Sequence, residues 1–303
     1  MQELCEGQVV VVTGAGNGIG RCHALAFAQV GAKVVVNDVG AARDGTGASV
    51  GPAQAVVDEI VAAGGEAVAN TDDISSWDGA ERLIRQAVDT YGRLDTLVNN
   101  AGILRDRMLV NMEEAEWDAV IRVHLKGTFA PTRHAAAHWR DRSKAGEEVD
   151  ARVVNTASPS GIFGNVGQAN YGAAKAGIAS FTLITAEELG RYGVRVNAIA
   201  PVALTRMTEG LSNVESLSRK DGWDPVDPAN ISPLVVWLGS PESRGVTGRV
   251  FSVSGGRISV NEGWVNGPTV DAGRQWDPAE LTEIVPALVA QAAPNANMNG
   301  QRK

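Results

Sequence analysis

VVVVTGAGNGIG, residues 9–20, is the most informative segment of the sequence for the architecture of the chain. Four valines and a threonine predict a buried strand, and the glycines at positions 14, 18 and 20 follow it at short intervals. Such glycines let the chain turn sharply into a helix and let its backbone approach a pyrophosphate, which the helix N-terminus would attract. The segment therefore predicts a dinucleotide site, with a tight turn that binds no ligand as the alternative. The residues predicted to contact the cofactor here are Gly14, Asn17, Gly18, Ile19 and Gly20.

The rest of the chain alternates between short β-branched runs and longer helical patterns. The predicted strands are Val9–Thr13, Lys33–Asp38, Glu66–Asn70, Leu94–Asn99, Arg152–Thr156, Arg195–Ala200 and Arg249–Ser254. The predicted helices span residues 18–30, 52–63, 77–91, 113–142, 171–192 and 231–238. Strands that are apolar almost throughout are typical of a parallel sheet covered by helices on both faces. We expect an α/β fold with a Rossmann-type, doubly wound sheet of seven parallel strands.

The strand–helix alternation stops near residue 256, which suggests a single domain followed by an extension. We assign residues 1–256 to a dinucleotide-binding catalytic domain. Residues 257–303 form a C-terminal extension that we expect to pack on this domain or on a neighbouring subunit. Trp264 and Trp276 lie in the extension, where they could cover an apolar substrate or contact another subunit.

Composition excludes several classes of protein. The 303 residues carry a formal net charge of −8 and no Lys- or Arg-rich run, so nucleic acid is not an expected partner. The two cysteines, Cys5 and Cys22, are too few for a disulfide framework and lack metal-ligand spacing, so no metal site is expected. No apolar run is long enough to span a bilayer, and the first residues do not resemble a secretory signal. A cytoplasmic location is the resulting expectation.

Acidic and small residues after the next three predicted strands would surround the adenosine of the cofactor. Asp38 can accept hydrogen bonds from both ribose hydroxyls and would repel a 2′-phosphate, which favours NAD over NADP. Arg43, close by, could instead receive such a phosphate. Asp73 and Ile74 are placed to border the adenine. Small residues at the end of the fourth strand would let a ribose lie against the backbone; these are Asn100, Ala101 and Gly102.

Ser158, Tyr171 and Lys175 carry the predicted chemistry. Ser158 follows the fifth strand, and Lys175 lies one helical turn after Tyr171 on the same face. Oxidation of an alcohol requires a hydride acceptor, which a nicotinamide provides, and a proton acceptor. A phenol accepts a proton readily only if its pKa of about 10 is lowered, which a neighbouring ammonium can do. The serine hydroxyl would hold the substrate oxygen. Tyr171 and Lys175 are also expected to contact the cofactor, the lysine by donating to the nicotinamide ribose.

These motifs together resemble the short-chain dehydrogenase/reductase family over residues 7 to 256. The shared elements are T-G-x-x-x-G-x-G, N-N-A-G, the serine and Y-x-x-x-K. Longer segments, NNAGILRDRM (99–108) and GNVGQANYGAAKAG (164–177) among them, look like the D-3-hydroxyacyl-CoA dehydrogenase module of peroxisomal multifunctional enzymes, also called 17β-hydroxysteroid dehydrogenase type 4, and its stand-alone bacterial relatives. The resemblance implies NAD-dependent oxidation of a 3-hydroxyacyl-CoA, with a steroid-derived or other bulky acyl group as one option. It also implies a homodimer or homotetramer.

The chain departs from the family pattern at two places. His124 occupies a position where most members carry an asparagine that takes part in a proton relay; we expect a variant relay, with simple packing as the alternative. Pro201-Val202 replaces the usual Pro-Gly, so the loop from residue 201 to 206 could take another path over the nicotinamide. The cofactor contacts expected in this loop are Pro201, Ala203 and Thr205.

Other interpretations remain open at this stage. Arg105 and Arg107 could meet a phosphate of CoA or lie in a solvated loop. An NADPH-dependent 3-oxoacyl carrier-protein reductase is the alternative enzyme. A catalytically silent, NAD-binding regulatory protein is the alternative outside enzymes, although an intact Ser158, Tyr171 and Lys175 argues against it.

Overall fold

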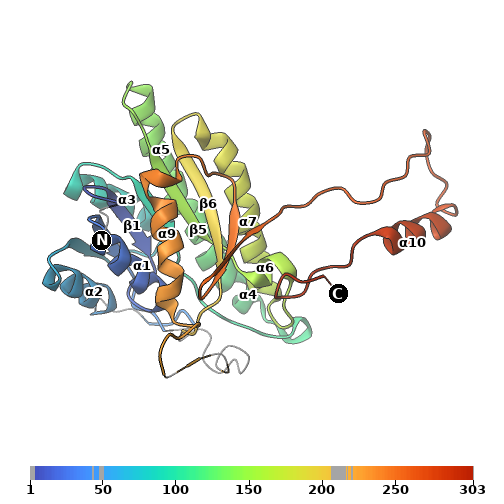
Figure 1. Ribbon diagram of the computed structural model, residues 1–303, viewed down its shortest axis with the longest axis horizontal. Coiled ribbons are helices and arrows are strands. Elements are labelled where there is room, and N and C mark those ends of the chain that lie inside the picture. The colour runs from blue at the N-terminus through green and yellow to red at the C-terminus, as the bar shows by residue number, and fades with distance from the viewer. Residues whose placement is uncertain are drawn as a thin grey trace.

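The computed structural model describes residues 4–42, 44–47, 51–205, 216, 218–219 and 221–302. Arg43, considered above as a phosphate ligand, lies outside the described residues. Within them, one eight-stranded sheet has the order β3-β2-β1-β4-β5-β6-β7-β8 (Figure 1). The strands are β1 Val9–Thr13, β2 Lys33–Asn37, β3 Glu66–Asn70, β4 Thr96–Asn99, β5 Ala151–Thr156, β6 Val194–Pro201, β7 Val250–Ser254 and β8 Arg257–Asn261.

Helices connect the parallel strands and cover both faces of the sheet. The α-helices are α1 Gly18–Gln29, α2 Gly51–Ala62, α3 Trp77–Tyr91, α4 Glu114–Ile121, α5 Gly127–Lys144, α6 Pro159–Phe163, α7 Ala169–Gly190, α9 Ser232–Gly239 and α10 Leu281–Gln291. Short 3-10 turns are η1 Leu109–Asn111, η3 Pro228–Ile231 and η4 Pro241–Ser243, and η2 Arg122–Lys126 is a π-helical turn.

The alternation of side chains along β1 explains the two-layer core. Val10 and Val12 pack in a cluster with residues of α1, α2 and α9, whereas Val9 and Val11 pack in a cluster with residues of α3, α5 and α7. Because both faces are covered, all five residues of β1 are buried. The doubly wound α/β architecture predicted from the sequence is thereby confirmed.

The number of strands differs from the expected seven. β8 pairs with β7 in the antiparallel direction and forms the edge of the sheet. Its side chains are largely exposed, with Ile258 at 56% and Val260 at 52%, so the segment lacks the continuous apolar pattern of the buried strands. The part of the chain that leaves the sheet therefore begins at residue 262 rather than 257.

The single helix predicted over residues 113–142 is interrupted. α4 passes into the π-helical turn η2, which leads directly into α5. A π-helical turn inserts one extra residue into a helix, and such insertions are frequent at functional sites. Here the inserted turn carries His124, whose side chain is buried.

Candidate active site

The glycine-rich turn between β1 and α1 is locked against the end of β4. Gly14 has a φ of 63°, and a Cβ at this position would lie 2.6 Å from Ala101 Cα. The Asn100 side-chain amide donates to the Thr13 and Gly14 carbonyls at 3.1 Å each. The Thr13 hydroxyl in turn accepts the backbone N–H groups of Asn100 and Ala101 at 3.0 and 3.2 Å. The two predicted cofactor segments are therefore brought together.

The start of α1 has the features of a phosphate cradle. Asn17 is the N-cap residue, and its side chain makes no capping hydrogen bond to the first turn. The first N–H groups of a helix have no intrahelical acceptor, so they are available to an anion. A Cβ on Gly18 would have Thr205 Cγ2, at 3.5 Å, as its nearest neighbour. The space above Gly18 is thus open on one side and bordered by Thr205 on the other.

Asp38 lies just beyond β2, beside the same turn. Its carboxylate accepts the N–H groups of Gly16 at 2.8 Å and Gly40 at 2.7 Å. These hydrogen bonds fix the orientation of a partly exposed carboxylate at the end of the strand. The glycine cradle, the orphan N–H groups and this carboxylate together fit the diphosphate and ribose of a nicotinamide dinucleotide.

The two residues predicted to border the adenine have different surroundings. The Asp73 carboxylate accepts the Ser75 N–H at 2.8 Å and its hydroxyl at 2.6 Å, and it lies 3.4 Å from an Arg122 guanidinium nitrogen. Asp73 thus orders the turn before α3, whatever its role toward a cofactor. Ile74 is buried and packs against the start of α5, where a Cβ on Gly127 would collide with it.

The loop after β6 reaches back over the cofactor cradle. Pro201 ends β6, Ala203 is buried, and the contact of Thr205 with the glycine-rich turn is described above. The Leu204 N–H donates to the Val226 carbonyl at 2.7 Å, which ties the loop to the segment that precedes α9. Arg206, at the end of the predicted loop, lies outside the described residues.

Ser158, Tyr171 and Lys175 converge at the carboxyl end of β5. Ser158 is the N-cap of α6 and is 7% exposed. Tyr171 lies in the first turn of α7 and forms a side-chain hydrogen bond with Ser158. The Lys175 Nζ lies 5.6 Å from the centroid of the Tyr171 ring and donates to the Thr156 carbonyl at 2.6 Å. The carbonyl at the end of β5 therefore holds the lysine beside the phenol.

The electrostatics of the pair differ from the sequence-based expectation. Burial raises the pKa of Tyr171 to about 12; the Ser158 hydrogen bond opposes the rise and the Asp106 carboxylate adds to it. Burial lowers the pKa of Lys175 to about 7. Desolvation thus has the largest effect on the pKa of both side chains: it disfavours the phenolate and the ammonium alike.

His124 lies against the same tyrosine. The two rings are edge-to-face, with centroids 5.1 Å apart. The His124 Nε2 lies 2.8 Å from the Ile103 carbonyl and 3.1 Å from the Ile103 N–H, whereas its buried Nδ1 has no hydrogen-bond partner among the described residues. Burial, reinforced by the Lys175 charge, lowers the pKa of His124 to about 3, so the imidazole is neutral. Gly102 lies directly beneath the ring, because a Cβ there would collide with His124 Cε1.

Asn170 fixes the start of α7 and was not among the residues predicted from the sequence. This fully buried side chain donates to the Arg105 carbonyl at 2.9 Å and the Glu116 carbonyl at 3.2 Å, and it accepts the Tyr171 N–H at 2.7 Å. Gln168, two residues earlier, donates to Asp106 at 2.7 Å and accepts from Ser160 at 2.7 Å. The available signal was an amide residue on either side of Ala169, directly before Tyr171.

Arg105 and Arg107 line a cavity of about 430 Å³. The Arg107 guanidinium pairs with Glu116 at 2.9 Å, and the Arg105 Nε donates to the Asp44 carbonyl at 3.0 Å. The carboxylates of Asp44, Asp106 and Glu116 line the same cavity. Three acidic side chains against two basic ones give no excess positive charge, so the cavity does not favour the CoA phosphate.

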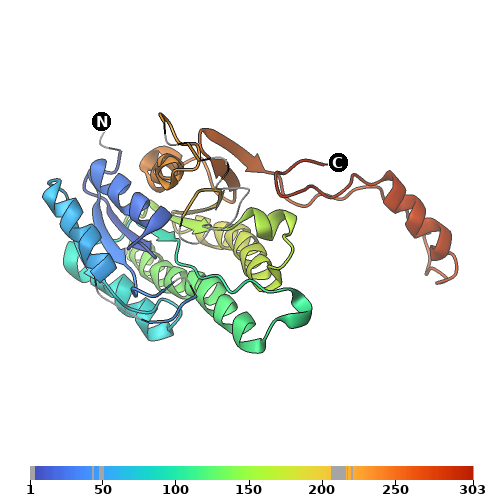
Figure 2. The same ribbon diagram turned by 90° about the horizontal axis from the view of Figure 1, so that it is seen from below.

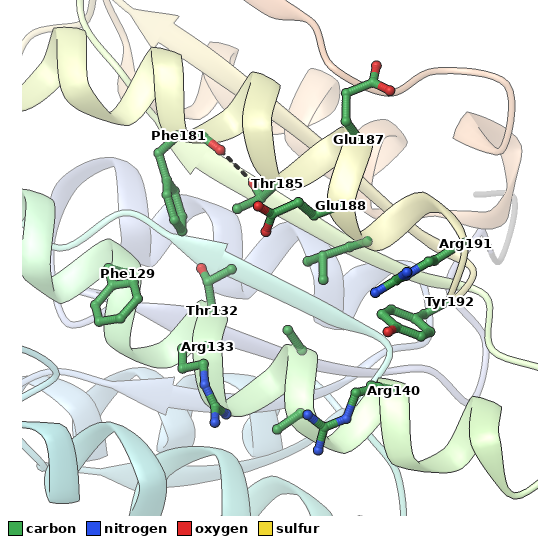
Figure 3. A pocket seen from close by; sticks show the side chains of 13 residues that line it. Phe129, Thr132, Arg133, Arg140, Phe181, Thr185, Glu187, Glu188, Arg191 and Tyr192 are labelled. Atoms are coloured by element: carbon green, nitrogen blue, oxygen red, sulfur yellow. Dashed lines mark hydrogen bonds between the residues drawn. The ribbon is translucent and has the colours of Figure 1, made fainter.

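A larger cavity, of about 530 Å³, lies far along α7 from the catalytic residues. Figure 3 shows Phe129, Arg133 and Arg140 from α5 facing Phe181, Glu188 and their neighbours from α7 across this groove. None of Ser158, Tyr171 and Lys175 lines it. The groove therefore belongs to an outer surface between two helices and not to the candidate active site.

The described residues contain neither a metal-binding cluster nor a membrane-spanning helix. Among the described residues, no three His, Cys, Asp or Glu side chains gather in a way that could hold a metal ion. Within the described residues, every helix is too short or too polar to span a membrane.

Comparison with known proteins identifies the family. The family model described as short chain dehydrogenase matches residues 8–216. The chain belongs to the short-chain dehydrogenase family. Membership implies an oxidoreductase with a nicotinamide cofactor, NAD or NADP.

Individual relatives show which short-chain dehydrogenases this chain resembles. A crystal structure of a short chain dehydrogenase from Mycobacterium avium has a TM-score of 0.89 and 59% sequence identity, and the match covers 97% of this chain and 98% of that one. Hydroxyacyl-CoA dehydrogenase ChsB1 of Mycobacterium tuberculosis is 48% identical over 91% of this chain and 86% of its own length. The peroxisomal hydratase-dehydrogenase-epimerase of Neurospora crassa is 44% identical over 84% of this chain, which spans only 27% of that protein. The resemblance to hydroxyacyl-CoA dehydrogenases inferred from the sequence is thereby confirmed.

Proposed function

We propose that the protein oxidises the secondary alcohol of a 3-hydroxyacyl-CoA to the corresponding ketone with NAD. The observation that carries this proposal is the convergence of Ser158, Tyr171 and Lys175 beside a dinucleotide cradle in a chain similar to ChsB1. A steroid-derived or other bulky acyl group is the variant of the substrate to test first.

Each side chain has a separate task in the proposed reaction. A bound nicotinamide would supply the hydride acceptor. Ser158 and Tyr171, already hydrogen-bonded to each other, would both contact the substrate hydroxyl. Ser158 would hold the oxygen, and Tyr171 would take its proton as general base in the ionised form, which a protonated Lys175 would favour. Lys175, held by the Thr156 carbonyl, has a pKa near neutrality and can therefore gain or lose a proton next to the phenol.

The neutral imidazole of His124 suits a relay by hydrogen bonds rather than by charge. Its Nδ1 has no described partner and its Nε2 is engaged by Ile103, so Nδ1 is the free end of the ring. We propose that a proton leaving Tyr171 passes toward this side of the site. A neutral imidazole can accept at one nitrogen and donate from the other.

Asp38 supports NAD as the cofactor. Its carboxylate is fixed by two backbone N–H groups at the end of β2, where an adenine ribose would lie. A 2′-phosphate placed there would meet a negative charge at short range. We therefore propose NAD over NADP.

The experiment is an absorbance assay for NADH formation with a panel of 3-hydroxyacyl-CoA thioesters, including steroid-derived ones, and with free sterols. We expect turnover with NAD and a CoA thioester. Preference for NADPH and a carrier-protein thioester would indicate the reductase instead. Binding of NADH without turnover of any alcohol would indicate the silent regulatory protein.

We also propose that the protein is a homo-oligomer. The α5–α7 face, which contains the groove of Figure 3, exposes Phe129 at 41%, Leu183 at 44% and Ile184 at 53%. α5 contributes Arg133 and α7 contributes Glu188 to the groove, so two copies related by a two-fold axis could pair opposite charges. The mass of the protein in solution tests this proposal.

A further inference from the structure

Gln168, the residue directly before α7, joins three segments that surround the catalytic residues. Its side-chain amide nitrogen donates to the Asp106 carboxylate, in the loop after β4, at 2.7 Å. Its side-chain carbonyl accepts the Ser160 hydroxyl of α6 at 2.7 Å and the Asn165 amide, between α6 and α7, at 2.9 Å. The Gln168 side chain is buried, so water does not readily replace these partners. One buried amide thus connects three segments of the chain.

The orientation of this amide is fixed by its partners. An ionised carboxylate accepts hydrogen bonds and has none to donate, so the amide nitrogen of Gln168 must face Asp106. The side-chain carbonyl oxygen then faces the hydroxyl of Ser160. A glutamate at this position would meet Asp106 with an acceptor instead of a donor. The pattern of hydrogen bonds therefore requires an amide at position 168 for as long as residue 106 is an aspartate.

The loop that carries Asp106 is held in register with Gln168 by backbone contacts. The Arg107 N–H donates to the Gly167 carbonyl at 2.8 Å, and Arg107 and Gln168 form an isolated parallel bridge. The backbone carbonyl of Gln168 also accepts the Gly172 N–H of α7 at 2.7 Å. Because these contacts use backbone atoms, a substitution of the Gln168 side chain leaves them in place. The side chain therefore has a task separate from building the start of α7.

The contact with Ser160 reaches the catalytic serine through α6. The Ser160 N–H donates to the Ser158 Oγ at 3.2 Å. α6 has only 5 residues, too few to be stable alone. Figures 1 and 2 show this short helix beside the start of α7, and the packing is close, because a Cβ on Gly161 would lie 2.7 Å from the Lys175 Cβ. The contacts with α7 and Gln168 thus decide where α6, and with it Ser158, is placed.

The hydrogen bond from Ser160 directs the proton of the Ser158 hydroxyl. One lone pair of the Ser158 Oγ is engaged by the Ser160 N–H, which leaves the hydroxyl proton for the hydrogen bond with Tyr171. This bond opposes the rise in the pKa of Tyr171, as a donor to a phenolate does. A chain of hydrogen-bonded residues therefore runs from Asp106 through Gln168 and the two serines to Tyr171.

We propose that Gln168 is a positioning residue for the oxidation of the secondary alcohol, the proposed function on which this inference rests. By joining Asp106 to α6, its side chain holds the Ser158 hydroxyl toward Tyr171 and the substrate oxygen. Gln168 acts through Ser158, which remains the catalytic residue. Loss of the bridge leaves the serine in place but less accurately oriented, which lowers kcat and spares cofactor binding.

Reversing the polarity of the hydrogen bond between residues 106 and 168 tests the proposal. At about pH 8, where a glutamate is ionised, Gln168→Glu places two acceptors against each other and should lower kcat by about 10- to 100-fold. Asp106→Asn combined with Gln168→Glu lets residue 106 donate and residue 168 accept, with the total charge of the wild type. We expect this double variant to recover kcat to within about threefold of the wild type. Wild-type kcat in Gln168→Glu, or a double variant no faster than Gln168→Glu, would overturn the proposal.

A matched control comes from a second glutamine that donates to an aspartate. Gln54 on α2 donates to Asp58 at 2.8 Å and is exposed. Gln54→Glu makes the same chemical change beside a carboxylate, and its kcat should equal that of the wild type. NADH binding, measured by fluorescence in every variant, shows that the protein is folded.

Hydrogen exchange of α6 separates this inference from the proposed function. Peptides that contain residues 160–163 should exchange faster in Gln168→Glu than in the wild type, and at the wild-type rate in the double variant, because the bridge holds α6 in place. A wild type that turns over no alcohol contradicts the proposed function. Exchange that is equal in the wild type and Gln168→Glu contradicts the bridge between Asp106 and α6, whatever the activity.

Discussion

The imidazole of His124 stands edge-on to the ring of Tyr171, with centroids 5.1 Å apart, in a π-helical turn that interrupts the α4–α5 segment. The inserted turn places the histidine over Gly102, where no larger residue fits. Ile103 engages the Nε2 of His124 through its carbonyl or its N–H, and the buried Nδ1 has no hydrogen-bond partner among the described residues. The local irregularity of the helix therefore serves the site and not the core.

His124 should act as a neutral hydrogen-bonding group. We expect His124→Asn to retain activity, because an amide can also donate and accept, whereas His124→Leu should lower kcat/KM by up to about 100-fold. With a pKa of about 3, His124 cannot produce a limb near neutral pH. The pH profile of kcat/KM is the measurement. A limb between pH 6 and 7 that His124→Asn abolishes would show that the histidine titrates during turnover.

Tyr171→Phe should remove the general base without changing the cofactor site. We expect kcat to fall by roughly two to four powers of ten, while NADH binding measured by fluorescence stays as in the wild type. Tyr192→Phe is the matched control, because Tyr192 lines the outer groove and the substitution removes the same atom. If Tyr171→Phe turned over substrate at the wild-type rate, another group would have to accept the proton.

Lys175 should make stability depend on pH. Its pKa is about 7 in the folded protein and about 10.5 when unfolded, so the unfolded chain binds more protons between these values and stability rises with pH across that window. Lys175→Met has no group at this position that can bind or release a proton. From pH 7 to 10 the wild type should gain on the variant by up to about 1.4 kcal/mol per pH unit in the free energy of urea unfolding. Parallel curves for the two proteins would mean that the lysine stays charged when folded.

The sequence predicts this fold well where the information is local. β1 and the glycine-rich turn follow from one run of valines and the glycines after it, and the predicted helix 77–91 coincides with α3. The sequence did not predict the elements whose formation depends on distant parts of the chain. β8 is an exposed edge strand with no apolar run. α10 has apolar residues at helical spacing, but Pro286 in its middle argues against a helix when the sequence is read alone.

The candidate site also combines features that follow from local sequence with features that depend on the folded chain. Ser158, Tyr171 and Lys175 could be named from their spacing, and the structure brings them together. The direction of the Tyr171 pKa could not be inferred from spacing, because it depends on how much water the folded chain excludes. The one-residue insertion at η2 is likewise invisible in a helical periodicity that continues on both sides of it.

Asp38 should control the choice of cofactor. We expect Asp38→Asn to reduce the ratio of kcat/KM for NAD to that for NADP, because the amide keeps the shape of the side chain but removes the charge that repels a 2′-phosphate. The Asn variant can still accept one of the two backbone hydrogen bonds from Gly16 and Gly40. An unchanged ratio would assign the discrimination to residues other than Asp38.

Gly14 should tolerate no side chain, for two separable reasons. Its φ of 63° is costly for other residues, and a Cβ would lie 2.6 Å from Ala101 Cα. Gly64 shares the first property, with a φ of 87°, but has open space around it. We expect Gly64→Ala to cost about 1–2 kcal/mol of unfolding free energy. Gly14→Ala should cost about 1–3 kcal/mol more and should also weaken NADH binding, since displacing Ala101 moves the wall of the cofactor cradle. Equal losses in urea unfolding would show that backbone strain alone, and not the contact with Ala101, requires glycine at position 14.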